Sequence, residues 1–301
     1  MRGLAIDPAV SPVFSGHWKK RQMTRMMWSG TVRALPFREQ VKAARIAGCT
    51  ALSISPMSYD LWRAAGISTR DMLAMAADEG VRVTHLDPIT RWHDNWLPDN
   101  LDPQLCPLGV IGYDVDDFFR IADALEVDTI SAMVTGEAGR SDLDRMTEDF
   151  AALCDRAGRM GLRCDLEFVP MWALPDLESA WYVLDNADRA NSGLTFDLWH
   201  YLRGNPDPEL LSSIPGNKIA AVQLTDGLAQ PFENDLLVDC LMHRHLPGKG
   251  ALPIQAVLAQ LDAIGALDNT VGFEVFSSMM DSLDAQTLGE ACRNSLADLD
   301  V

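Results

Sequence analysis

The stretch GLTFDLWHYLRG, residues 193–204, has the pattern of a buried strand that runs into a loop. Asp197 stands where the apolar run ends, and His200 follows it three positions later. Side chains alternate along a strand, so residues three apart point to opposite faces unless the strand stops between them. The pair therefore indicates the carboxyl-terminal end of a strand.

The same pattern of a short apolar strand followed by a helix recurs along the whole chain. Strands are expected at 24–30, 50–56, 81–88, 128–135, 162–170, 192–200, 218–226 and 270–277. Helices are expected near 37–48, 57–80, 114–125, 141–160, 176–189, 207–213, 253–264 and 282–299. Regular alternation of these elements is typical of an α/β protein with a parallel sheet.

Two α/β architectures fit this alternation: a doubly wound open sheet and a closed (β/α)8 barrel. No GxGxxG motif follows the first strand, which weakens the dinucleotide-binding form of the open sheet. Eight repeats of strand and helix favour closure. Because single α/β barrels commonly run past roughly 200 residues, the sequence predicts one TIM-barrel domain over residues 1–301.

The charge and composition of the chain limit its partners. Its net charge is −18, and such a chain repels phosphate backbones and anionic membranes, so we expect no nucleic-acid and no membrane partner. The first residues lack the apolar segment of a signal peptide, and no run approaches the roughly 18 apolar residues of a membrane span. Six scattered cysteines without a CxxC pair are typical of a reducing compartment. We therefore expect a soluble cytoplasmic protein, with a homo-oligomer left open.

Two connections exceed the usual length of an α/β loop. Residues 89–112 follow the third strand, and residues 227–252 follow the seventh. Both leave the carboxyl ends of strands, where a barrel builds its active site. We expect both loops to cover that site.

Four polar residues interrupt the last four strands where each nears its end, namely Glu167, Asp197, Gln223 and Glu274. Each alone could be a strand-end group that is hydrogen-bonded locally. Burying a bare carboxylate costs several kcal/mol unless a partner is present. Since neighbouring strands of a barrel converge on one axis, the set predicts a bound divalent ion. Oxygen ligands favour Mn2+ or Mg2+ over Zn2+, with Co2+ as a further alternative.

The series LEF, FDLWH, VQLTD, RHLPGKG and FEVFS resembles the sugar phosphate isomerase/epimerase family, which has the xylose-isomerase-like TIM-barrel fold and includes related dehydratases. The resemblance is close over residues 162–277 and rests on periodicity alone before them. It implies a metal bound by Glu167, Asp197, Gln223 and Glu274, with His200 contacting a substrate oxygen. It also implies that Arg244 reaches a substrate hydroxyl or carboxylate from its loop.

The family mechanism that the resemblance implies is proton abstraction beside a carbonyl, with the resulting enediolate held by the metal. Glu167 and Glu274 are the expected catalytic acids and bases, one on each face of the reacting carbon, and His200 is the third catalytic residue. Return of the proton gives epimerisation or isomerisation, whereas loss of a β-hydroxyl gives dehydration. The expected substrate is a small polyhydroxylated hydroxy ketone.

Two departures from the family pattern bear on the reaction. Members acting on free ketoses usually carry histidine where this chain has Gln223, and another glutamate where it has Ala173. Glutamine at the strand-seven position is familiar among the dehydratases. An isomerase or epimerase is the first hypothesis, and a dehydratase or lyase of keto-inositol or dehydroshikimate type is the alternative.

Two further hypotheses come from other classes. A DNA-repair endonuclease on the same barrel is disfavoured by the acidic charge and by the supply of only six histidines. A non-catalytic binding barrel is compatible with the fold, but the Glu167 and Glu274 pair argues against it.

Aromatic residues and histidines near the predicted strand ends are candidates for the pocket wall. Tryptophan can stack on a sugar or a flat ring, so Trp199 and Trp92 are expected to bind substrate, together with His85 at the end of the third strand. His93 is an alternative acid or base. Further tryptophans near strand ends are Trp28, Trp62, Trp96 and Trp172.

Overall fold

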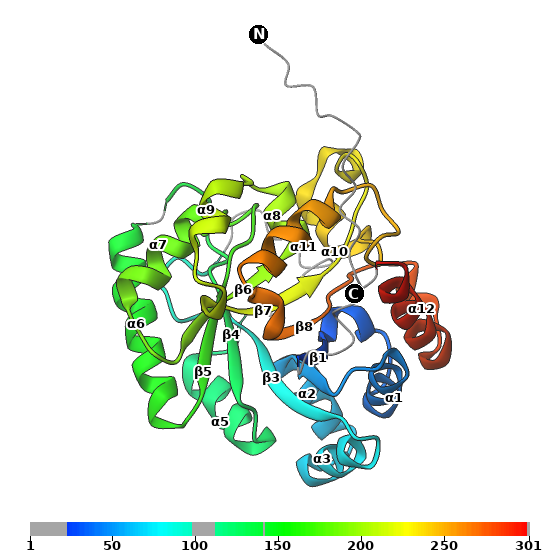
Figure 1. The fold of residues 1–301 in the computed structure, drawn as a ribbon. Coiled ribbons are helices and arrows are strands. Elements are labelled where there is room, and N and C mark those ends of the chain that lie inside the picture. The colour runs from blue at the N-terminus through cyan, green and yellow to red at the C-terminus, as the bar shows by residue number, and fades with distance from the viewer. Residues whose placement is uncertain (1–22, 98–111, 141, 300–301) are drawn as a thin grey trace.

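The eight strands of the protein close into one parallel barrel, in the order β1 to β8 (Figure 1). The structure is a computed structural model that describes residues 23–97, 112–140 and 142–299. The strands are β1 (Thr24–Met27), β2 (Ala51–Ile54), β3 (Arg82–Ile89), β4 (Thr129–Met133), β5 (Arg163–Glu167), β6 (Ser192–Asp197), β7 (Ile219–Leu224) and β8 (Thr270–Phe273). The predicted (β/α)8 barrel is confirmed.

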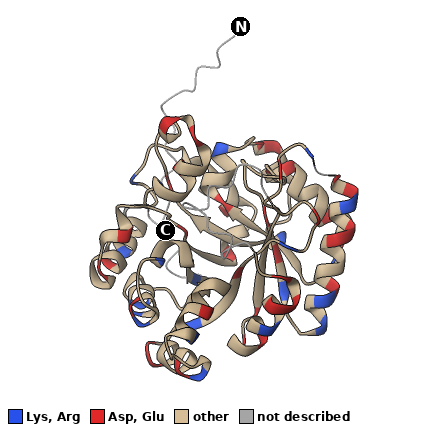
Figure 2. Ribbon diagram, turned by 180° about the vertical axis from the view of Figure 1, so that it is seen from behind, with Lys and Arg blue, Asp and Glu red and all other residues tan. Residues whose placement is uncertain are grey.

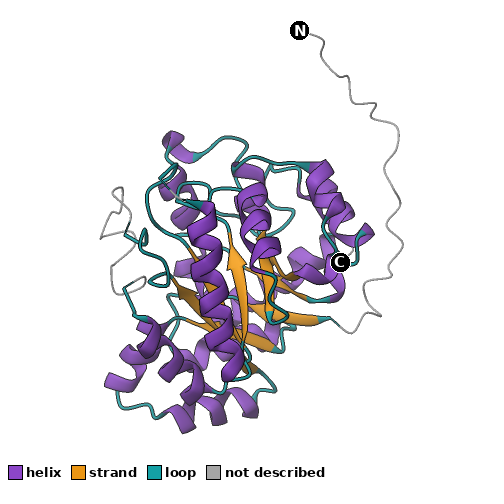
Figure 3. Cartoon of the chain, turned by 90° about the vertical axis from the view of Figure 1, so that its left-hand side faces the viewer, coloured by secondary structure: helices purple, strands orange, loops and turns teal. Residues whose placement is uncertain are grey.

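Helices surround the barrel and separate it from solvent (Figure 3). They are α1 (Phe37–Ala47), α2 (Pro56–Ala64), α3 (Thr69–Asp78), α5 (Val115–Leu125), α6 (Leu143–Arg159), α7 (Leu177–Ala187), α8 (Leu198–Arg203), α9 (Pro208–Ser213), α10 (Leu236–Met242), α11 (Ile254–Ala263) and α12 (Ala285–Asp298). Short 3-10 turns lie at Ser29–Val32, Gly216–Lys218, Phe232–Asn234, Ala266–Asp268 and Met280–Ser282. Among the described residues, no helix combines the length and the apolar character needed to cross a membrane.

The structure corrects three predicted boundaries. The single helix expected over 57–80 is two helices, because Gly66 adopts a left-handed backbone conformation between them and Ser68 then caps α3. The strand expected over 192–200 stops at Asp197, since that residue caps α8. The loop over 227–252 contains the helix α10, and Asp235 caps its start.

Several aspartates lie at helix starts. Asp114, Asp142, Asp176, Asp207 and Asp284 each accept backbone N–H groups in the first turn of a helix. A carboxylate there satisfies otherwise unpaired N–H groups and complements the helix dipole. Figure 2 shows the acidic and basic residues distributed over the surrounding helices. Part of the acidic charge of the chain thus serves to cap helices.

The hydrophobic core fills the layer between the strands and the helices. Outward-facing strand residues such as Leu52, Leu166 and Phe196 are fully buried against the apolar faces of helices, including Phe150 of α6. Apolar burial of this kind is the main favourable contribution to folding. The barrel interior is different, because many of its side chains are polar.

Closure of the barrel needs a residue without a side chain where β8 meets β1. Met26 pairs with Gly272 there, and a Cβ on Gly272 would lie 1.7 Å from the carbonyl oxygen of Met26. Any other residue would force the two strands apart. This contact sets the position of Glu274, which follows β8 directly.

Candidate metal centre and active site

A cavity of about 260 Å³ lies at the carboxyl ends of the strands. Its polar lining includes Asp87 from β3, Glu167 from β5, His200 from α8, Arg244 from the loop after β7, and Glu274 after β8. Its apolar walls include Met133, Val169, Trp172, Leu241 and Phe276. The charged groups therefore converge in a pocket with apolar walls, the usual form of a small-molecule site.

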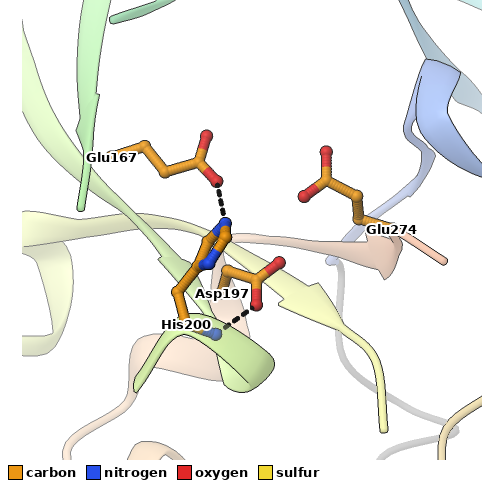
Figure 4. Close-up of side chains that lie close together, drawn as sticks. All are labelled: Glu167, Asp197, His200 and Glu274. Carbon is orange, nitrogen blue, oxygen red and sulfur yellow. Dashed lines mark hydrogen bonds and ion pairs between the residues drawn. The ribbon is translucent and has the colours of Figure 1, made fainter. Parts of the chain in front are cut away.

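Four of the buried side chains form a compact group of candidate metal ligands. One donor atom each from Glu167, Asp197, His200 and Glu274 lies within 4.8 Å of all the others. Figure 4 shows Glu167 and Glu274 on opposite sides, with their carboxylates toward Asp197 and His200 between them. The sequence-based expectation that three of these carboxylates converge agrees with this geometry.

Asp197 explains the three-residue spacing in the stretch DLWH. Its Oδ1 accepts a hydrogen bond from the backbone N–H of His200 at 2.8 Å, as an N-cap residue does in the first turn of a helix. Its Oδ2 accepts from Nη1 of Arg244 at 2.7 Å. Burial raises the pKa of Asp197, but Arg244 and the other neighbouring groups outweigh it, and the net shift is downward. Asp197 is therefore the ionised member of the group.

His200 is a neutral imidazole in these surroundings. Burial lowers its pKa to about 3. Its Nε2 lies 3.4 Å from Oε1 of Glu167 and 3.3 Å from Nη2 of Arg244. Its Nδ1 is buried and has no hydrogen-bond partner among the described residues. A neutral imidazole with a free nitrogen can bind a metal ion or a substrate oxygen.

Arg244 lies inside the protein instead of reaching out from its loop. Its side chain is 1% exposed, donates to the carbonyl oxygen of Cys240, and lies 3.6 Å from Oε2 of Glu274. The rings of Trp199 and Phe276 lie 5.1 and 5.2 Å from its guanidinium carbon. Arg244 thus adds one fixed positive charge next to Asp197 and Glu274.

The loop that carries Arg244 is held by Asp226. Its carboxylate accepts the backbone N–H groups of Gly227, Gly250 and Leu252, at 2.7 to 3.0 Å. A Cβ on Gly250 would lie 2.4 Å from Oδ1 of Asp226, so this position excludes a side chain. The PGKG stretch and the acidic residue after β7 therefore shape the loop.

Glu167 and Glu274 lie where their charges repel each other. Burial raises the pKa of Glu167 well above its usual value, and Asp87 and Asp197 raise it further. Burial likewise raises the pKa of Glu274, and Glu167 adds to the shift. Arg244 opposes both shifts but supplies only one positive charge. Carboxylates arranged in this way ionise together only when further positive charge is present.

Gln223 adds an independent sign that this end of the barrel binds a ligand. It lies opposite Asp197 in the pairing of β6 with β7 and is fully buried. Neither its Oε1 nor its Nε2 finds a hydrogen-bond partner in the part of the chain that the structure describes. Unpaired buried amides are costly and rare. Three carboxylates, an imidazole and this amide oxygen are a donor set that fits a divalent ion.

Asp87 is a site residue that the sequence reasoning missed. It lines the cavity near the end of β3, and its Oδ1 is buried without a partner in the described ranges. Burial raises its pKa to about 7, and the Ser131 hydroxyl on β4 partly offsets this shift. The signal in the sequence was an acidic residue before proline at the end of an apolar strand.

Three residues expected to bind substrate do not line the cavity. His85 lies in the interior of β3, at the level of Thr129 at the start of β4, and lines a separate pocket at the amino ends of the strands. Trp92 donates its Nε1–H to the carbonyl oxygen of Met133 and packs on Phe150. Trp199 is fully buried behind Arg244. These three side chains support the fold around the site.

The remaining candidate residues lie partly in the cavity wall and partly in the protein around it. Trp172 lines the cavity, whereas His93 pairs with Asp149 at 2.8 Å and Trp62 packs on Phe37. Of the expected covering loops, 227–252 contributes Cys240, Leu241 and Arg244 to the cavity. Most of 89–112 lies outside the described residues.

Comparisons with known proteins identify the family of the chain. The model of the family described as xylose isomerase-like TIM barrel matches residues 41–294. A 3-dehydroshikimate dehydratase of Pseudomonas aeruginosa is 28% identical over 264 residues, which are 86% of this chain and 38% of that protein. An inosose isomerase of Bacillus subtilis is 29% identical over 178 residues, 58% of this chain and 61% of that protein.

Solved structures share the fold. The crystal structure of IOLI protein with a binding zinc atom superimposes with a TM-score of 0.74 at 18% identity, over 92% of this chain and 98% of that one. A fusion protein of a xylose isomerase-like TIM barrel and a 4-hydroxyphenylpyruvate dioxygenase gives 0.76 at 23% identity, over 92% of this chain and 42% of that one. The chain spans less than two fifths of the length of the Pseudomonas dehydratases that it matches, at 38% and 36%.

Proposed function

This chain belongs to the xylose isomerase-like TIM barrel family, and from that premise we propose that it is a divalent-metal-dependent enzyme acting on a cyclic, sugar-like hydroxy ketone. It removes a proton from the carbon beside the carbonyl group. The observation that carries the proposal is the pair Glu167 and Glu274, whose carboxylates face each other across the candidate metal site with raised pKa values. Such pairs are typical of proton transfer at an active site.

Each residue has a role that follows from its position. A carboxylate oxygen of one glutamate takes the proton, and the carboxyl group of the other, on the opposite side, can return one. His200 is neutral, so it hydrogen-bonds a substrate oxygen and does not act as a cationic acid. Asp197, Gln223 and the two glutamates would hold the metal ion, and His200 is an alternative ligand in place of that hydrogen bond. A bound divalent ion would supply Lewis acidity that lowers the pKa of the C–H bond beside a carbonyl.

Proton removal can lead to loss of water or to isomerisation, and the observations favour loss of water. The similarity to the Pseudomonas aeruginosa dehydratase extends over 86% of the chain, against 58% for the Bacillus subtilis inosose isomerase. The amide of Gln223 on β7 is a second observation in the same direction, since glutamine there is familiar among dehydratases of the family. Isomerisation or epimerisation is the second candidate, which the inosose isomerase relatives favour.

The candidate ligands suit more than one divalent metal ion. The expectation from the sequence was Mn2+, on the basis of oxygen ligands alone. The proximity of His200 adds a nitrogen donor to the group, which brings Zn2+ into the range of suitable ions. The zinc atom of the IOLI structure belongs to that protein and is consistent with this wider range.

Deuterium exchange tests the proposal directly. The protein loaded with Mn2+ or Zn2+ is incubated in D2O with dehydroshikimate or a keto-inositol, and C–H exchange is followed by NMR. We expect exchange with at least one compound, and an ultraviolet-absorbing product if water is lost. Glu274→Gln should reduce the rate at least ~100-fold, whereas Glu178→Gln on the exposed face of α7 should leave it unchanged. Unaltered exchange in Glu274→Gln would remove that residue from the mechanism.

A further inference from the structure

Asp87 differs from three other buried aspartates of the described chain, because its Oδ1 has no hydrogen-bond partner within those residues and the Ser131 hydroxyl opposes the effect of burial on its pKa only in part. Asp239 receives Nε and Nη2 of Arg203, at 3.2 and 3.0 Å, and Asp226 receives three backbone N–H groups. Asp165, on the inner side of β5, pairs with Arg163 at 3.1 Å. Asp87 is also buried, at 6% exposure, yet its Oδ1 has no partner within the described ranges.

The position of Asp87 connects this unpaired oxygen to the cavity. Its side chain lines the cavity together with Glu167 and Glu274, but it is not part of the four-residue group of candidate ligands. All three acids line one cavity of about 260 Å³, and the charge of Asp87 raises the pKa of both glutamates. A molecule that places its reacting carbon between the glutamates therefore extends toward Asp87.

We propose that Asp87 is a substrate-binding residue that accepts a hydrogen bond from a hydroxyl group of the ketone substrate, away from the reacting carbon. The inference rests on the proposed function. It also narrows the substrate class. The part of the substrate that contacts β3 should carry a hydroxyl group. A carboxylate or phosphate there would be repelled by Asp87 and the neighbouring glutamates. A buried acceptor without a hydrogen-bond donor costs free energy, and a substrate hydroxyl would supply the missing donor.

Binding of a polyol tests the inference without any turnover. The probe is myo-inositol, which has hydroxyl groups but no carbonyl, titrated calorimetrically at a Mn2+ concentration that saturates each variant. We expect the dissociation constant to rise tenfold or more in Asp87→Ala, and less in Asp87→Asn, which keeps an acceptor oxygen. Asp165→Ala is the matched control, because it removes a buried aspartate of the same barrel interior that does not line the cavity.

Stability separates a binding role from a structural one. Asp87→Ala removes a buried carboxyl group whose Oδ1 lacks a partner among the described residues, so the metal-free variant should melt at the wild-type temperature or above it. Asp165→Ala is the comparison in the same measurement, because it removes a buried carboxylate that does have a partner, Arg163. A lower melting temperature for Asp87→Ala with unchanged myo-inositol binding would assign Asp87 to the structure of the fold and overturn the inference.

The outcomes distinguish this inference from the proposed function. Equal binding of myo-inositol by wild type and Asp87→Ala, or no binding by either, overturns the role of Asp87. Binding that depends on Asp87 without any C–H exchange of dehydroshikimate or keto-inositol supports that role and contradicts the proposed reaction. Where a keto compound does react, Asp87→Ala should raise KM at least tenfold and change kcat much less.

Discussion

Strand β5 carries two inward-facing acids two residues apart, Asp165 and Glu167, and their surroundings differ. Asp165 accepts a hydrogen bond from Arg163 of its own strand. Glu167 lies at the carboxyl end of the strand, 3.4 Å from a neutral histidine and under the influence of Asp87 and Asp197. Burial raises the pKa of both acids, but Arg163 opposes the shift of Asp165, whereas Asp87 and Asp197 add to the shift of Glu167.

The same contrast extends over the protein. A structural set of buried acids, Asp165, Asp226 and Asp239, is satisfied by groups of the chain itself. A site set, Asp87, Glu167 and Glu274, is buried where positive charge is scarce, and burial raises the pKa of all three. Burial raises the pKa of Asp165 as well, but there Arg163 opposes the shift. Asp197 belongs to neither set: it lies inside the site, but Arg244 lowers its pKa and keeps it ionised. Conformational stability and ligand binding thus depend on different carboxylates, and substitutions should separate them.

The largest effect on stability is expected in the structural set. Asp239→Ala leaves Arg203 buried and unpaired, and the free energy of unfolding should fall by about 3–5 kcal/mol. Urea denaturation measures this change. Asp117→Ala, which breaks an exposed ion pair with Arg120, is the control and should change the value by less than about 1 kcal/mol. If Asp239→Ala lowers the free energy of unfolding as little as the control does, the buried ion pair with Arg203 does not stabilise the fold.

Metal should stabilise the protein through the candidate metal ligands, including Glu274, and not through the structural set. At a free Mn2+ concentration about 100 times the dissociation constant, the free energy of unfolding should rise by about 2.7 kcal/mol over the value in EDTA. Glu274→Gln should lose most of this gain, while Asp165→Asn should keep it on a lower baseline. If Mn2+ and Zn2+ both fail to stabilise the wild type, the site set has another partner.

The two glutamates should make the stability of the metal-free protein fall as the pH rises. Acids whose pKa is lowered by an ion pair have the opposite effect. Glu167 and Glu274 have folded pKa values above the ordinary 4.5, so the folded chain retains protons that the unfolded chain releases. The stability they contribute is complete below about pH 4.5 and is lost as the pH rises toward their folded pKa values.

Glu274→Gln in EDTA isolates this contribution. The free energy of unfolding of the wild type should fall more steeply from pH 5 to pH 8 than that of the variant, because the variant lacks one of the two carboxyl groups with a raised pKa. His85 and His200, whose pKa values are lowered by burial, act in the opposite direction below pH 6.5, but they are present in both proteins. Parallel pH profiles would contradict the repulsion between the two glutamates.

The smallest effects are expected for aromatic and histidine side chains outside the cavity. His85→Asn and Trp92→Phe should change KM less than about twofold, because neither residue lines the cavity. Trp172→Phe, in the cavity wall, should raise KM more. Steady-state kinetics on any keto compound that exchanges deuterium provides the comparison, and a large KM effect for His85→Asn would restore the sequence-based expectation.

The convergence of Glu167, Asp197 and Glu274 was predictable because strand order in a barrel determines which chain segments meet. Periodicity located the strands, and the end of each apolar run located the polar residue. The position of His200 was also accessible, since a carboxylate three residues before it can cap a helix. These features depend on local sequence and on topology alone.

Features that depend on strand register and side-chain direction were not predictable. His85 was expected at a strand end, but β3 continues to Ile89, and pairing with Thr129 places His85 near the amino ends of the strands. Asp87 was overlooked because its burial depends on neighbours from other strands. The burial of Arg244 against Asp197 joins residues 47 positions apart, which no local pattern indicates.

Anomalous diffraction from crystals grown with Mn2+ tests the metal centre most directly. We predict one strong peak at the manganese edge in the barrel, within bonding distance of Glu167, Asp197 and Glu274, and its coordination will show whether Gln223, His200 or both complete the shell. A well-ordered cavity that contains no such peak, or a peak bound by other residues, would contradict the proposed centre.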